Sequence, residues 1–148
     1  MDKAYFPYGE KSKEFLLKRA LYICSYLRSK NVEKIIFACN TLSLIVLPFI
    51  KLFFDNVYGV FDVFLPYIND NSAIIGSKST INYLYKLYPK LLLIDGSELI
   101  SKIENKEDYS QIIDDLNAKI KNRSNLMLAC THFIDINQEF VIDVYKNM

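Results

Sequence analysis

Glycine is scarce in this chain: only four of its 148 residues are Gly, and they form no glycine-rich loop. This disfavours a nucleotide-binding fold of the GxGxxG or Walker type, because both need several glycines where the backbone approaches phosphate. Long hydrophobic runs are also lacking. The longest candidate, residues 42–54, contains Lys51 and Pro48, so no stretch has the length and character of a transmembrane helix.

Neither sign of charge dominates, since 18 basic residues stand against 17 acidic residues. The balance therefore points to no nucleic-acid or membrane partner. The chain has one histidine and three cysteines, Cys24, Cys39 and Cys130, at spacings unlike those of a zinc site. Residues 1–3 lack the apolar core of a signal peptide. We expect a cytoplasmic protein with reduced thiols.

Apolar residues make up 51% of the chain and supply a hydrophobic core. They occur in short runs that alternate with segments of helical periodicity, without hairpin signals, and this pattern predicts an α/β fold with parallel strands. The expected strands are 34–39, 57–61, 73–76, 91–94, 126–129 and a closing strand at 140–144. The expected helices are 12–29, 41–54, 81–88, 97–104 and 108–121.

One expected helix carries a proline. Thr41 is a plausible N-cap for the helix 41–54, and Pro48 inside it should remove one backbone hydrogen bond and kink it. Cys24 lies within the helix 12–29, where we interpret it as a small buried hydrophobic residue.

Two stretches of the chain, residues 34–41 and 125–132, resemble each other. Each has an apolar run, then Ala-Cys, then polar residues that can begin a helix. Ligands of open α/β sheets bind where parallel strands end, and a helix start favours a thiolate. Thiols at Cys39 and Cys130, one on each side of a small carbon acid, could remove a proton from one face and return one to the other. The pattern therefore suggests racemase chemistry.

Each of these residues also has a structural interpretation. A cysteine after an apolar run is usually part of a core. His132, two residues from Cys130, is either an ordinary imidazole or the proton partner of the thiol. Asp62 and Asp95 follow strands and are either loop caps or functional carboxylates, with Asp62 the better functional candidate. The hydroxyls and amides of residues 77–80, at the start of a helix, would suit a carboxylate.

Five motifs, in order, resemble those of glutamate racemase, a member of the cofactor-independent aspartate/glutamate racemases. They are residues 2–12, Ala38-Cys39-Asn40-Thr41, Gly59-Val60-Phe61-Asp62, Ile75-Gly76-Ser77-Lys78-Ser79-Thr80-Ile81 and Ala129-Cys130-Thr131-His132. The resemblance implies two small pseudo-symmetric α/β lobes, with parallel sheets flanked by helices and the active site in the cleft between them. Residues 1–70 with 133–148 would form the first lobe, and residues 71–132 the second.

The resemblance also assigns roles. Cys39 would serve the D-glutamate face and Cys130 the L-glutamate face, with His132 assisting Cys130 and Asp62 as a further catalytic carboxylate. No pyridoxal phosphate, other cofactor or metal is implied, and the family's usual role is in cell-wall synthesis. The positions that match substrate contacts are Pro7, Tyr8, Gly9, Asn40, Thr41, Ser77, Thr80 and Thr131.

The chain departs from the family in three ways. The family's opening strand, which ends in Asp-Ser-Gly and supplies a carboxylate to the first thiol, has no counterpart here. Asp62 and Ser77 replace the family's Glu and Thr, and the final segment is shortened to residues 134–148. A sheet without its first strands exposes an edge. Either a second copy of the chain covers this edge in a homodimer, or the lobe is only marginally stable.

Three hypotheses follow. The chain is a minimal racemase of glutamate, with aspartate as the other substrate to consider. Alternatively it is a degenerate racemase fold kept as a binding or interaction protein, or a fragment of a longer racemase.

Overall fold

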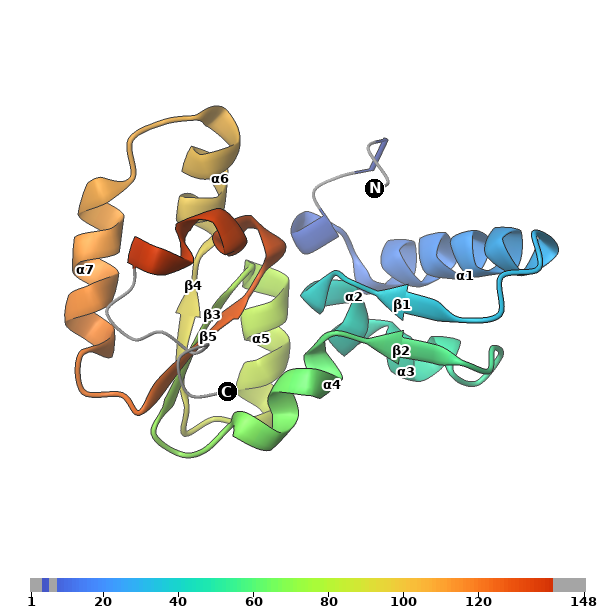
Figure 1. Cartoon of the computed structure of the whole chain (residues 1–148), viewed down its shortest axis with the longest axis horizontal. Helices are drawn as coiled ribbons and strands as arrows, with labels where there is room; N and C mark the ends of the chain where they lie inside the picture. Colours follow the sequence, from blue (N-terminus) through green and yellow to red (C-terminus); the bar gives the residue numbers. More distant parts are fainter. Residues whose placement is uncertain (1–3, 6–7, 140–148) are drawn as a thin grey trace. The chain divides into compact units, whose positions relative to one another are not determined.

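The computed structural model describes residues 4–5 and 8–139. The chain divides into two compact units, Met1–Pro66 and Tyr67–Met148, whose helices and strands are labelled in Figure 1. Pro7 and the expected strand 140–144 lie outside the described residues. Among the residues that are described, no helix is long and apolar enough to cross a membrane.

The first unit contains a two-stranded parallel sheet and short helices. Strands β1 and β2 pair in parallel, with Ile35 opposite Val57 and Phe37 opposite Gly59. Its elements in order are η1 (Tyr8–Glu10), α1 (Lys13–Ser29), β1 (Ile35–Phe37), α2 (Asn40–Ile45), α3 (Leu47–Ile50), β2 (Val57–Gly59) and α4 (Phe61–Phe64), followed by η2 (Leu65–Tyr67) at the boundary of the units.

Helix α1 confirms the expected helix 12–29. Ser12 is its N-cap and accepts a hydrogen bond from the Phe15 backbone N–H at 3.2 Å. Leu16, Ala20 and Cys24, spaced by four residues, form its buried face. Cys24 is only 1% exposed, as expected for a core residue, and burial raises the pKa of its thiol.

The single helix expected over 41–54 is wrong, because the structure has two short helices, α2 and α3, on either side of Val46. Pro48 lies in the first turn of α3, where its missing N–H costs no helical hydrogen bond, so the chain restarts a helix instead of kinking one. The N-cap of α2 is Cys39, and Thr41 lies inside the helix, so the expected N-cap role of Thr41 is also wrong.

The expected strand 57–61 ends early. Strand β2 stops at Gly59, and Phe61 turns into α4 and is buried there. Gly59 is required by close packing, since a Cβ at this position would lie 2.6 Å from Leu47 Cδ2 and 2.8 Å from Ser43 Oγ. The Ser43 hydroxyl in turn donates a 2.9 Å hydrogen bond to the Phe37 carbonyl, which fastens α2 to the sheet.

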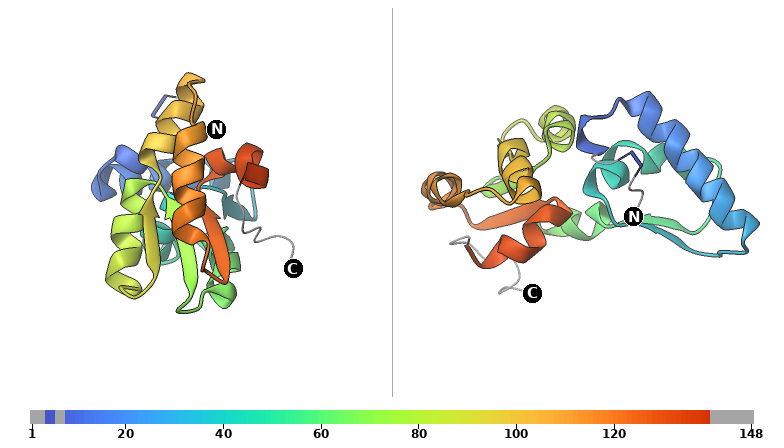
Figure 2. Two further views of the ribbon diagram at one scale, coloured as in Figure 1. Left: turned by 90° about the vertical axis from the view of Figure 1, so that its left-hand side faces the viewer. Right: turned by 90° about the horizontal axis from the view of Figure 1, so that it is seen from above.

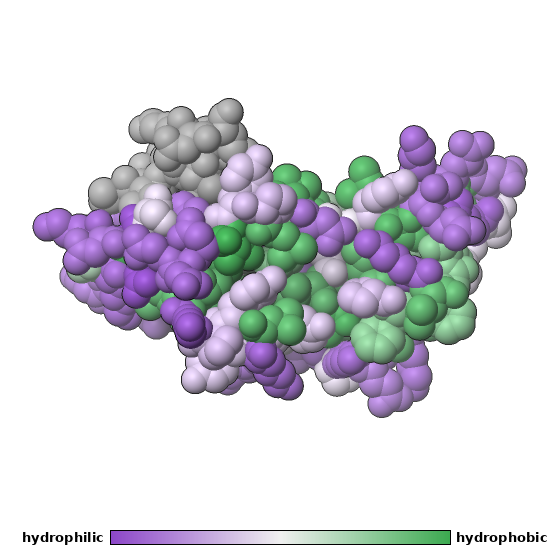
Figure 3. All heavy atoms as spheres, turned by 90° about the horizontal axis from the view of Figure 1, so that it is seen from below, coloured by the Kyte–Doolittle hydropathy of each residue, from purple (hydrophilic) through white to green (hydrophobic). Residues whose placement is uncertain are grey.

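The two faces of the β1–β2 sheet differ. Ile35, Phe37 and Val57 are buried, whereas the paired residues Ile36 and Tyr58 on the opposite face are 67% and 49% exposed. Parallel sheets are normally buried on both faces, so this sheet has one open apolar face. Hydrophobic residues are visible at the surface of the first unit, the right-hand half of the space-filling view (Figure 3).

The second unit contains a three-stranded sheet in the order β4-β3-β5, with all strands parallel. It matches the expected strands and helices closely. Its elements are β3 (Ser72–Gly76), α5 (Lys78–Leu87), β4 (Leu92–Asp95), α6 (Ser97–Asn105), α7 (Ser110–Ile120), β5 (Asn125–Ala129) and η3 (Thr131–Glu139).

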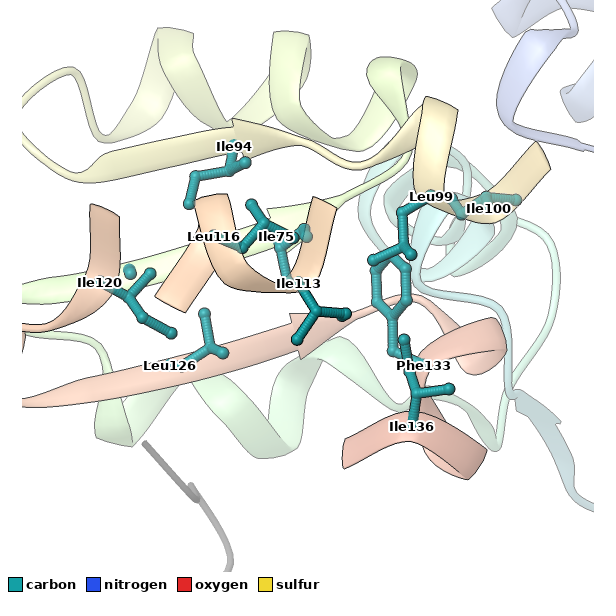
Figure 4. Close-up of a cluster of buried hydrophobic side chains, with 11 residues drawn as sticks. Ile75, Ile94, Leu99, Ile100, Ile113, Leu116, Ile120, Leu126, Phe133 and Ile136 are labelled. Carbon is teal, nitrogen blue, oxygen red and sulfur yellow. The ribbon is translucent and has the colours of Figure 1, made fainter. Parts of the chain in front are cut away.

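Helices cover both faces of this sheet, with α5 on one side and α7 on the other (Figures 1 and 2). The side chains of α7 point toward the strands, where Ile113, Leu116 and Ile120 meet Ile75 and Leu126 in one buried cluster (Figure 4). Every residue of the central strand β3 is therefore buried.

The 3-10 helix η3, which follows β5, packs in the second unit, although we expected residues 133–148 to belong to the first lobe. Phe133 is completely buried and, with Ile136, belongs to the core cluster of the second unit. The contact is tight, because a Cβ at Gly96 would lie 2.9 Å from the Phe133 ring. The physical reason is apolar burial: these two side chains fill the space beside α6.

Candidate functional site

The three strands of the second unit end side by side. Gly76 at the end of β3 is the register partner of Asp95 at the end of β4 and of Ala129 at the end of β5. The residues that follow these strands, Ser77 and Cys130 among them, therefore begin at one edge of the sheet. Ligands bind at this edge in parallel α/β folds.

A line of three side chains forms there. The Cys130 sulfur lies 3.1 Å from His132 Nδ1, and His132 Nε2 lies 2.9 Å from Glu104 Oε1. Glu104 is near the end of α6, while Cys130 and His132 flank the start of the 3-10 helix η3, and α6 and η3 are in contact. The thiol, the imidazole and the carboxylate thus form a continuous chain of hydrogen bonds.

This order fixes the direction of proton transfer. An ionised carboxylate only accepts, so a neutral His132 ring donates its Nε2–H to Glu104 and keeps Nδ1 as the acceptor for the Cys130 thiol hydrogen. When the proton moves to Nδ1, Glu104 stabilises the resulting imidazolium. Cys130 can therefore cycle between thiol and thiolate with a proton store beside it.

Sequence reasoning found Cys130 and His132 but missed Glu104. The available signal was weak. Glu98, Glu104 and Glu107 all lie in or just after the helical segment that follows β4, and nothing in the spacing distinguishes the one that reaches His132.

Ser77 and Thr80 also lie at this edge and contact each other. Their hydroxyl oxygens are 3.1 Å apart. Ser77 is the N-cap residue of α5, but its side chain makes no capping hydrogen bond. Thr80 is completely buried and Ser77 is partly exposed. Of the two, Ser77 is the hydroxyl that a ligand can contact in this conformation.

The first unit gathers another group of expected site residues. Cys39 is the partly exposed N-cap of α2, and Asn40 and Thr41 follow it in the first turn. The short helix η1, which contains Tyr8 and Gly9, is in contact with α2. These residues are therefore close together within this unit.

Asn40 has an unusual environment. It is only 6% exposed, and its carboxamide oxygen has no hydrogen-bond donor among the described residues. Leaving a buried acceptor unpaired costs about 1–3 kcal/mol. A ligand with an N–H or O–H group would satisfy this oxygen.

Asp62 is placed differently. It lies in the first turn of α4 and pairs with Lys51 at 3.5 Å, and both side chains are about half exposed. Such surface ion pairs contribute little to stability. Within the described residues, no group of three or more His, Cys, Asp or Glu side chains is arranged to hold a metal ion.

Comparison with known proteins identifies the relatives of this chain. No family model matches it. It is 31% identical to a glutamate racemase of Buchnera aphidicola subsp. Schizaphis graminum, over 94% of this chain and 63% of the relative. It is 27% identical to a glutamate racemase of Borreliella burgdorferi, over 99% of this chain and 63% of that protein. Over nearly its whole length, the chain is similar in sequence to these glutamate racemases.

A solved structure shows the same fold. The crystal structure of glutamate racemase from Francisella tularensis in complex with D-glutamate superposes with a TM-score of 0.73 at 24% identity, covering 93% of this chain and 59% of that chain. The expected α/β class with parallel sheets is thereby confirmed. The chain spans less than two thirds of the length of the curated glutamate racemases just described.

Proposed function

We propose that this chain interconverts L- and D-glutamate by proton transfer at Cα, with Cys130 and Cys39 as the two bases. The observation that carries the proposal is the hydrogen-bonded line from Cys130 through His132 to Glu104. The similarity of the chain to glutamate racemases supports the choice of reaction and substrate.

In the direction from L- to D-glutamate, the Cys130 thiol first gives its proton to His132 Nδ1. The thiolate then removes the proton from Cα, which leaves a carbanion stabilised by the adjacent carboxyl group. The Cys39 thiol donates its proton to the opposite face, and the configuration inverts. No covalent bond forms between protein and substrate, and each proton is accounted for by one sulfur or by the His132 ring.

In the reverse direction, Cys39 is the base and Cys130 the acid. The proton held by His132 then resupplies the Cys130 sulfur. The mechanism requires both thiols to reach one substrate molecule from opposite faces.

Substrate binding would use the polar groups near the two thiols. The unpaired acceptor of Asn40 suits the ammonium group of an amino acid, and the partly exposed hydroxyl of Ser77 suits a carboxylate. Tyr8, Gly9, Thr41 and Thr131 are further proposed contacts, and Thr80 would act through Ser77. Asp62 is held by Lys51, and we assign it no step.

Deuterium incorporation at Cα in heavy water tests the proposal. We expect the parent protein to exchange the Cα proton of both L- and D-glutamate, and to exchange aspartate more slowly. Cys130→Ser and Cys39→Ser should each abolish inversion, whereas Cys24→Ala, in the core of the first unit, serves as the control for loss of a thiol. Binding of glutamate without exchange, or unchanged exchange in both Cys39→Ala and Cys130→Ala, would contradict the proposal.

A further inference from the structure

The loop that follows β4 is tied to the start of α5 by a set of hydrogen bonds. The Gly96 backbone N–H donates to the Gly76 carbonyl at 2.8 Å. Asp95 Oδ1 accepts from the Ser97 backbone N–H at 3.0 Å and from the Ser97 hydroxyl at 2.6 Å. The Ser97 oxygen accepts from the Lys78 backbone N–H at 3.1 Å. Asp95 is thus linked through Ser97 to the first residue of α5.

This link supplies a cap that α5 does not obtain from its own N-cap residue. The first N–H groups of a helix have no partner inside the helix, and a Ser at the N-cap usually satisfies one of them. Here the Ser77 side chain makes no such bond, and its hydroxyl lies beside that of Thr80. Ser97, from the neighbouring loop, takes the N–H of Lys78 instead.

The orientation of the Ser97 hydroxyl is also determined. Its hydrogen is committed to the Asp95 carboxylate, so its lone pairs are directed to the Lys78 N–H, and a charged acceptor strengthens the arrangement. Asp95 and Ser97 are both exposed. Ile81 and Leu84 bury α5 against its unit, and the Ser97 cap adds to the stability of that helix.

We propose that Asp95 and Ser97 are positioning residues for Ser77. They tie the first residue of α5 to the end of β4, and so hold the adjacent Ser77 hydroxyl at the edge of the sheet where Cys130 also begins. They touch no substrate themselves and act through Ser77. The inference rests on the proposed function, in which Ser77 contacts a carboxylate of glutamate.

The test compares Ser97→Ala with Ser101→Ala, a matched loss of an exposed hydroxyl on the same helix α6. KM and kcat are measured for Cα deuterium exchange of both glutamate enantiomers, together with the thermal midpoint of unfolding. We expect Ser97→Ala to raise KM about three- to tenfold, the size of one neutral hydrogen bond. Its kcat should change less than KM, and its thermal midpoint should lie somewhat below that of Ser101→Ala, because the cap of α5 is lost. Ser97→Thr, which keeps the hydroxyl, should restore KM.

A double-mutant cycle with Ser77→Ala identifies the route of the effect. If Ser97 acts through Ser77, Ser97→Ala changes KM little further in the Ser77→Ala background. Full additivity, or a parental KM in Ser97→Ala, overturns the inference and leaves the proposed function standing. A parent protein without any exchange of glutamate overturns both.

Discussion

The two units place a cysteine after a strand in very different surroundings. In the second unit, Cys130 follows a strand of a three-stranded sheet and is backed by His132 and Glu104. In the first unit, Cys39 follows a two-stranded sheet with one open face, and no described residue forms a hydrogen bond with its thiol. The second unit therefore surrounds its thiol with hydrogen-bonding side chains, whereas in the first unit the thiol is followed by Asn40, whose buried carboxamide oxygen has no partner among the described residues.

The largest effect on the exchange rate should come from removing the hydrogen-bond partner of Cys130 in the second unit. His132→Asn removes the proton store of Cys130 while it keeps a polar side chain of similar size. We expect the initial rate of Cα exchange of L-glutamate to fall by about 10²–10⁴, the usual contribution of a general acid or base. Proton NMR in heavy water measures the rate. A loss of less than threefold would show that Cys130 works without the imidazole.

Glu104→Gln should have the next largest effect. The neutral amide cannot stabilise the His132 imidazolium as a carboxylate does, so we expect about a tenfold or greater loss of exchange with L-glutamate. Glu98→Gln, on the exposed face of the same helix, is the matched control and should keep the parental rate. Equal rates in the two variants would remove Glu104 from the mechanism.

Asn40→Ala tests whether the unpaired acceptor in the first unit binds substrate. The substitution removes a buried acceptor that has no described partner, so the thermal midpoint should fall less than for an ordinary buried polar residue. We expect KM for glutamate to rise, because the substrate ammonium loses its acceptor. Thermal unfolding and exchange kinetics measure the two quantities. A large loss of stability with an unchanged KM would indicate that the Asn40 carboxamide is purely structural.

Cys24, the third cysteine, should react more slowly than Cys39 and Cys130. Burial raises the pKa of Cys24, so the native protein should be alkylated by iodoacetamide at Cys39 and Cys130 well before Cys24. Peptide mass spectrometry measures the order. Above the ordinary thiol pKa of about 8.5 the unfolded chain releases a proton that folded Cys24 retains, so this residue makes the fold less stable as pH rises. Early modification of Cys24 would show that α1 opens readily.

The smallest effect concerns the open face of the first unit. Ile36→Thr and Tyr58→Thr replace exposed apolar side chains on paired positions and should leave the thermal midpoint almost unchanged. We expect weaker self-association in light scattering at high protein concentration, because the apolar area available for contact is smaller. The exposed Tyr85→Thr on α5 is a control from the second unit.

Much of the second unit could be predicted from the sequence because its strands are buried on both faces. Runs such as residues 126–129 are continuously apolar, and a Cys or a Ser follows where the strand ends. The helix prediction was wrong where the local sequence is compatible with two structures. Pro48 fits either a kinked helix or the first turn of a new one, and the packing of Leu47 and Ser43 on Gly59 decides between them.

The candidate site could be predicted only where neighbours in sequence act together. Cys130 and His132 are two residues apart, so their contact could be predicted from the sequence. Glu104 reaches them only because α6 packs against η3, which is a tertiary contact. The burial of Phe133 and Ile136 in the second unit is likewise a property of the packed core, since their spacing alone suits either lobe.

The parallel pairing of β1 with β2 has a consequence for biosynthesis. Ile35–Phe37 emerges from the ribosome before α2, α3 and finally Val57–Gly59 are available to pair with it. During translation this apolar strand therefore waits without a partner, and non-local parallel pairing of this kind forms slowly. An apolar strand edge that is still unpaired is prone to misassembly, so the pairing of β1 is complete only after residue 59 has been synthesised.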